Sequence, residues 1–130
     1  MKIFLMTLFF ILPLFAGENC PLDLEESPYC GELQWVDGPH LDRKSHFIVR
    51  LWLKTDAERS PVEPKGQVKI FSWMTMANGH NHGGPKFTVE RPEVGVYEVK
   101  DARFFMGGMQ GHWDVKVTLE SMASSLVSFN

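Results

Sequence analysis

Residues 45–54 read SHFIVRLWLK, and apolar side chains occupy every second position along them. Alternation with a period of two is typical of a β-strand that has one face in a core and the other in water. The inner face of this strand is predicted to hold Phe47, Val49, Leu51 and Leu53. The outer face is predicted to hold His46, Arg50 and Lys54, with Ile48 and Trp52 among them.

The same alternation returns in residues 66–76 and in residues 112–120. One parity of the first segment carries Val68, Ile70, Ser72, Met74 and Met76. The inward positions of the second segment are Trp113, Val115, Val117 and Leu119. These two segments therefore predict two further half-buried strands.

Shorter strands are expected at 32–36, 86–90 and 95–100, with a further one at 103–106. Gly, Pro and Asn predict turns or loops at 56–66, 77–85, 92–95 and 107–111. Residues 121–130 form either a frayed tail or a last edge strand. No window follows a helical period over three turns, so the sequence predicts an all-β sandwich of about seven short strands.

The chain has 130 residues and a net charge of −3, which allows one domain and provides no basic patch for nucleic acid. It carries no nucleophile motif, no phosphate-binding Gly loop that leads into a helix, and no paired carboxylates in an evident cleft. We therefore expect a protein that is not an enzyme and has no nucleic-acid partner.

Residues 1–17 are predicted to be a cleaved secretory signal peptide, with Lys2 at a basic start and small residues at Ala16 and Gly17. The apolar run between them is shorter than the ~20 residues that span a bilayer, so no membrane span is expected after cleavage. The cleavage bond itself is left open. Lipid attachment at Cys20 is a weaker alternative, because Glu18 and Asn19 precede it instead of small residues. The expected location is the periplasm or the exterior.

Cys20 and Cys30 are the chain's 2 cysteines. An exported protein meets an oxidising compartment, so the pair favours a disulfide within the N-terminal segment, residues 18–43. The alternative is a thiolate metal site, which would require both thiols to stay reduced.

Two Gly-rich segments, MTMANGHNHGG at 74–84 and MGGMQGH at 106–112, combine thioether and imidazole side chains. Loops at one end of a sandwich can meet in space. Thioether sulfur prefers Cu(I), and imidazole accepts copper and zinc, so the combination suits copper, with Cu(I) favoured. The candidate metal ligands are Met74, Met76, His80, His82, Met106, Met109 and His112.

Ordinary packing explains part of the same pattern. Met74 and Met76 share the parity of Val68 and Ile70, which is what core side chains would do. His80, His82 and His112 would be solvated by default, and His40 and His46 are expected to be ordinary polar residues.

The run GQVKIFSWMTMANGH at 66–80 resembles the central motif of YtkA-like domains, in which a strand ends in a Met-rich turn that leads to His and Gly. Residues 95–99, 105–106 and 111–117 resemble the second half of that family: a Gly-x-Tyr strand, a Met-containing turn and a Gly-x-Trp strand. The resemblance covers residues 44–120. The turn at 106–111 is longer than is usual in the family.

This resemblance implies an immunoglobulin-like β-sandwich, exported or membrane-anchored. YtkA-like domains and the related FixH-like proteins are often associated with copper handling. The positions that match the family pattern are Met74, Met76, His80, Met106 and Trp113. The extra candidate ligands in this chain are His82, Met109 and His112.

Two functions remain open. The first is an exported module that binds copper through Met and His and acts as a metal carrier or accessory, with an envelope protein as a further partner. The second is a metal-free immunoglobulin-like protein-interaction domain. Both share one fold, so the fold alone does not choose between them. The expected organisation is a leader at 1–17, an N-terminal segment at 18–43, the sandwich at 44–120 and a tail at 121–130.

Overall fold

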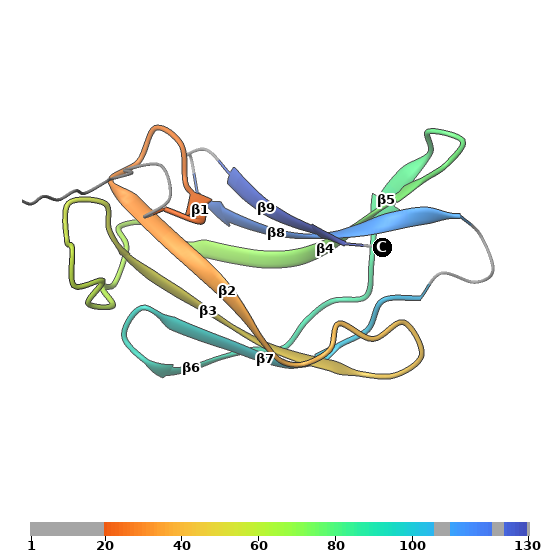
Figure 1. The fold of residues 1–130 in the computed structure, drawn as a ribbon, viewed down its shortest axis with the longest axis horizontal. Coiled ribbons are helices and arrows are strands. Elements are labelled where there is room, and N and C mark those ends of the chain that lie inside the picture. Colours follow the sequence, from red (N-terminus) through yellow and green to blue (C-terminus); the bar gives the residue numbers. More distant parts are fainter. Residues whose placement is uncertain (1–19, 106–109, 121–123, 130) are drawn as a thin grey trace, which may run out of the picture.

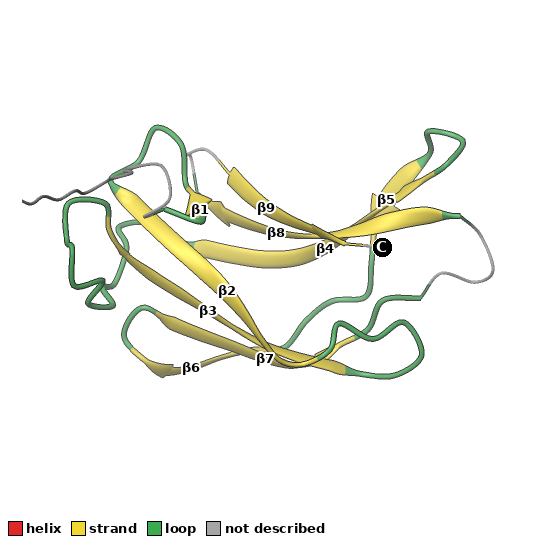
Figure 2. Cartoon of the chain, in the orientation of Figure 1, coloured by secondary structure: helices red, strands yellow, loops and turns green. Residues whose placement is uncertain are grey.

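The computed structural model describes residues 20–105, 110–120 and 124–129, and the predicted leader at 1–17 lies outside them. Two layers of strands face each other across a core, and Figure 2 shows strands and loops only. Within the described residues no helix is long and apolar enough to cross a membrane. The strands are β1 (Leu22–Asp23), β2 (Tyr29–Asp37), β3 (Ser45–Leu53), β4 (Val68–Met76), β5 (Asn81–Gly83), β6 (Val89–Glu93), β7 (Val96–Ala102), β8 (Gly111–Leu119) and β9 (Ser124–Phe129).

Both sheets are antiparallel. One has the order β1-β2-β3-β7-β6 and the other the order β5-β4-β8-β9. An immunoglobulin fold places its strands A, B, E and D in one sheet and C, F and G in the other, with C′ added beside C in some domains. β2-β3-β7-β6 and β5-β4-β8-β9 follow that order. The expected β-sandwich is therefore confirmed, and it includes strands on both sides of residues 44–120.

The core lies between the inner faces of the two sheets, as the alternation predicts. The nearly inaccessible inward positions of β3 and β8 are Phe47, Val49, Leu51, Trp113, Val115, Val117 and Leu119. Edge-to-face aromatic contacts link the sheets: the ring centroids of Phe47 and Phe87 are 5.7 Å apart, and those of Phe104 and Trp113 are 5.6 Å apart. Phe87 and Phe104 come from the connections between strands and complete the core.

The end of β3 departs from the expectation. Leu53, predicted to face inward, is 37% exposed, whereas Trp52, predicted to face outward, is 2% exposed. The cause is the connection after β3, which folds back over this strand. Pro61 forms a β-bridge with Trp52, and the Arg59 guanidinium lies 4.8 Å from the Trp52 ring centroid. Trp52 is therefore buried beneath a loop on the outer face of its sheet.

Several strand boundaries also differ from the expectation. The predicted loop at 77–85 contains β5, and the strand predicted at 86–90 begins at Val89 and continues through Pro92. Pro92 is tolerated because β6 is an edge strand and its pairing is irregular between Glu90 and Glu93. Residues 103–105 are not a strand, and Met106 lies outside the described residues. The last segment contains β9, which confirms the edge-strand alternative.

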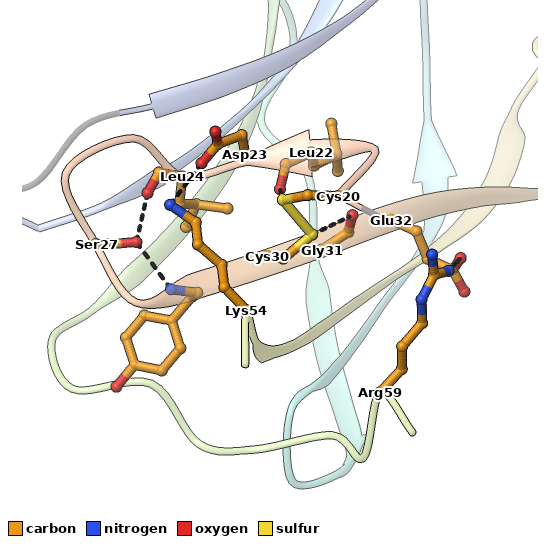
Figure 3. Close-up of a disulfide and its surroundings, with 11 residues drawn as sticks. Cys20, Leu22, Asp23, Leu24, Ser27, Cys30, Gly31, Glu32, Lys54 and Arg59 are labelled. Atoms are coloured by element: carbon orange, nitrogen blue, oxygen red, sulfur yellow. Dashed lines mark hydrogen bonds and ion pairs between the residues drawn. A yellow bond between two sulfur atoms is a disulfide. The ribbon is translucent and has the colours of Figure 1, made fainter. Parts of the chain in front are cut away.

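The N-terminal segment is tied to the sandwich by a disulfide between Cys20 and Cys30, which confirms the predicted pairing (Figure 3). β1 pairs with β2, and Leu22 and Leu24 are buried. The Lys54 ammonium lies 2.7 Å from the Asp23 carboxylate (Figure 3). This segment is therefore part of the core and extends the sheet of β3.

Gly79 and Gly95 both have positive φ angles, but they differ in how closely other atoms approach them. Gly95 and Gly79 have φ angles of 74° and 94°, but only Gly95 has neighbours that a Cβ atom would meet, the backbone N and O of Val62 at 2.6 Å. We expect Gly79→Ala to lower the free energy of unfolding by about 1–2 kcal/mol, the usual cost of a left-handed residue. Gly95→Ala should lower it further, because the Val62 backbone has to move. Urea unfolding of both variants tests this, and equal losses would contradict it.

Candidate functional site

The two Gly-rich segments meet at one end of the sheet β5-β4-β8-β9. Thr75 of β4 lies opposite His112 of β8, and Met76 lies opposite Gly111. The Ala77 N–H donates to the Gln110 carbonyl at 2.9 Å. Figure 1 shows the end of β4, β5 and the start of β8 together on the right of the molecule. The structure therefore brings the described parts of both segments together.

A tight hairpin joins β4 to β5. The Met76 N–H donates to the His80 carbonyl at 2.7 Å, and the Gly79 N–H donates to the Met76 carbonyl at 2.9 Å. The Asn78 side chain accepts a hydrogen bond from the His80 N–H at 3.0 Å. Asn followed by Gly is a strong local signal for a hairpin, and Gly79 supplies the positive φ that this turn requires. That signal in the sequence could have located β5.

One face of this hairpin carries sulfur on one arm and imidazole on the other. Met74 lies directly opposite His82, and Met76 is hydrogen-bonded across the turn to His80. Side chains directly opposite each other share a face, with Cβ atoms about 5 Å apart, and alternate residues share a face along one arm. We call this face the hairpin face: Met74, Met76, His80 and His82.

Burial changes steeply across the hairpin face. Met74 is 2% exposed and packs in the core with Trp113, so of the two roles considered for Met74 the structure shows core packing. Met76 is partly buried against that core, and it lines an open hollow of about 240 Å³ with Ala77, Asn78 and Gln110. His80 and His82 are exposed. The accessible donors on this face are therefore the Met76 thioether and two imidazoles.

The orientation of His82 leaves a ring nitrogen available. Its Nδ1 lies 2.9 Å from the Gly83 carbonyl oxygen, a distance at which an N–H would donate. When Nδ1 donates, the Nε2 lone pair faces away and can bind a metal ion, the usual arrangement of metal-bound histidine. His82 can therefore act as an oriented neutral ligand.

His112 lies apart from the hairpin face. It is opposite Thr75, one position out of phase with Met74 and Met76, so its side chain leaves the other face of the sheet. Its Nε2 is 3.8 Å from the carboxylate of Asp114, which is buried. The other two candidates, Met106 and Met109, lie outside the described residues. Both precede β8 in the sequence.

The remaining histidines are bound to carboxylates elsewhere, as expected of ordinary polar residues. His40 Nε2 lies 2.6 Å from Asp37, and His46 Nε2 lies 2.6 Å from Glu98. The hydrogen bond from His40 holds the pKa of Asp37 below its usual value. Across the part of the chain that the structure describes, no group of three His, Cys, Asp or Glu side chains is placed to hold a metal ion. A metal site on the hairpin face therefore depends on methionine sulfur.

Comparison of the chain with family models, with curated proteins and with solved structures finds no match. The resemblance to YtkA-like domains stays a prediction.

The two methionines on the hairpin face should differ in their effect on folding. Met74→Ala removes a fully buried side chain and should lower the free energy of unfolding by about 2–5 kcal/mol, whereas Met76→Ala should cost less because Met76 is only partly buried. Urea unfolding of the metal-free variants provides both values. A Met76 loss as large as the Met74 loss would show that Met76 is a core residue and not an accessible donor.

Proposed function

We propose that this protein is a small exported module that binds one Cu(I) ion on the hairpin face. The primary ligands are Met76, His80 and His82, and the sequence of the second Gly-rich segment contributes Met106 and Met109 as further candidate donors. In this proposal the protein is a metal carrier or an accessory to a metalloprotein in the periplasm or outside the cell.

The observation that carries the proposal is the pairing of sulfur with imidazole across one hairpin. Thioether and neutral imidazole suit Cu(I), because both are uncharged and sulfur is a soft ligand. Met76 and His80 are joined by a hydrogen bond across the turn, and His82 shares their face two residues further along. All three ligands belong to the single segment 76–82, so the site does not require distant segments to converge.

The same geometry favours transport over electron transfer. Blue-copper sites use a cysteine ligand together with two histidines. Cys20 and Cys30 are joined to each other beside β1 and β2, in the opposite sheet. The donors on the hairpin face are also exposed or only partly buried, which suits an ion that is accepted and handed on.

A metal-free protein-interaction domain is the second candidate function. It is favoured by a separate observation, the unpaired edge of β4 beside an apolar groove. Both functions use the same sandwich, and one protein can perform both.

Titration with Cu(I) against a chromogenic chelator tests the proposal on the chain from residue 18 onward. We expect one bound ion. Met76→Leu keeps the volume but removes the sulfur, so we expect it to weaken binding at least tenfold, and His82→Ala should do the same. His40→Ala removes a histidine at Asp37, away from the hairpin, and should leave the affinity unchanged.

Two results of this titration would contradict the copper proposal. If the folded protein binds neither Cu(I) nor Cu(II), the metal function is excluded and the interaction domain is left. If Met76→Leu and His82→Ala bind copper as well as the parent does, the ion binds elsewhere and the hairpin face is not the site.

A further inference from the structure

The strand β4 is paired along only part of one edge. On the side away from β8, β5 pairs with Trp73, Met74 and Thr75, and the Gly84 N–H donates to the Ser72 carbonyl at 3.2 Å. Before Ser72, no described strand pairs with this side of β4. Figure 1 shows β4 continuing well beyond the end of β5. Residues Val68–Phe71 therefore form an open edge on a strand that is paired along its other side by β8.

The backbone at this edge is oriented to bond another strand. The Met76 N–H and the Ser72 carbonyl both bond toward the β5 side. Backbone groups of an antiparallel strand alternate between its two neighbours. The N–H and C=O groups of Val68 and Ile70 therefore point toward the open edge, because both residues have the parity of Ser72.

An apolar groove follows the same edge. It has a volume of about 480 Å³, and Ile70 and Phe87 within it are buried. One wall comes from β4 and the residue before it, and the other from the chain that crosses to β6. The lining residues are Gln67, Lys69, Ile70, Phe71, Lys86, Phe87 and Val89.

Two exposed lysines, Lys69 and Lys86, line this groove. Neither forms an ion pair with any residue in the described ranges, whereas Lys54 and Lys100 pair with Asp23 and Glu90. The two lysines give this groove a positive charge. The chain as a whole has a net charge of −3, so the groove differs in sign from the rest of the protein. The charge complement of such a groove is an acidic ligand.

We propose that this groove, the β4 edge groove, binds an extended acidic peptide of a partner protein by strand addition. Backbone groups of the peptide bond to Val68 and Ile70, and alternate apolar side chains enter the groove over Phe87. Acidic side chains of the peptide pair with Lys69 and Lys86. Main-chain bonds supply affinity in such complexes, and the pockets for alternate side chains supply specificity.

A second copy of this chain is a poorer occupant, because antiparallel pairing of two β4 edges would bring lysines of like charge together. Lysines also protect edge strands from unwanted pairing in many sheets. If Lys69 and Lys86 only protect the edge, no peptide should bind there. If the groove instead takes a small amphipathic anion, such an anion should produce the same shifts as the peptide.

The test is an NMR titration of the ¹⁵N-labelled folded protein with a blocked peptide of alternating Val and Glu, about eight residues at ~3.3 Å each. We expect saturable shifts at the amides of Val68 and Ile70 and slower hydrogen exchange at Ile70. A Val and Lys peptide of equal length should bind at least tenfold more weakly. Lys69→Glu combined with Lys86→Glu should reverse this preference.

Matched variants localise the effect. Val68→Pro removes one edge N–H at the first position of a strand, where proline is tolerated, and should weaken binding at least tenfold. Val68→Thr keeps that N–H and should bind like the parent. Lys44→Glu changes the net charge on an exposed loop and should not alter the peptide preference.

The proposal is overturned if no saturable shift appears at millimolar peptide, if the shifts are confined to another surface, or if binding ignores the lysine reversal. Decanoate that produces the same shifts, without slowing exchange at Ile70, would assign the groove to a small anion instead. Because the readout requires no metal, failure here leaves the copper proposal untouched, and failure of copper binding leaves this one untouched.

Discussion

The antiparallel pairing of β4 with β8 is the constraint on which both candidate sites depend. The register runs without interruption from Val68 opposite Leu119 to Met76 opposite Gly111. A slip of one residue would turn every side chain to the opposite face, and it would expose Trp113 and Val115 while burying Lys116. The free-energy cost of exposing these apolar side chains and burying a lysine therefore fixes the register. The register in turn places Met74 in the core and Met76 at the end of the sheet.

The short length of β5 connects the hairpin face with the open edge. Its pairing extends from Thr75 back to Trp73, and the chain then leaves the sheet at Gly84. A Cβ atom at Gly84 would lie 2.6 Å from the Trp113 ring, so only glycine lets the backbone pass this closely. The chain next buries Phe87 between Phe47 and Phe104 and joins the other sheet. Because it leaves early, no strand among the described residues pairs with the first half of β4 on that side.

The two proposed sites lie at opposite ends of one strand. The donors of the hairpin face surround the end of β4, and the groove follows its start, so an ion and an extended peptide would not compete for the same atoms. A metal carrier has to recognise the protein that receives its ion. A peptide bound along β4 would hold such a partner on the same sheet as the ion. The two proposed sites could therefore serve one transfer function, although neither site requires the other.

Local alternation in the sequence determined the all-β class, the inward residues of β3 before Trp52, and the inward residues of β8. The disulfide pairing also followed from the sequence, because two cysteines allow only one internal pairing. These features depend on the parity of neighbouring residues or on the number of cysteines, and both are evident from the sequence alone.

Tertiary structure alone decided the rest. Trp52 is buried because a loop returns over it, Pro92 is tolerated because β6 has a free edge, and Met74 and Met76 differ because the core ends between them. The open edge of β4 likewise depends on where a distant segment leaves the sheet. Alternation reports which side chains share a face. It does not report which residues, far along the chain, come to cover that face, because that depends on contacts between segments.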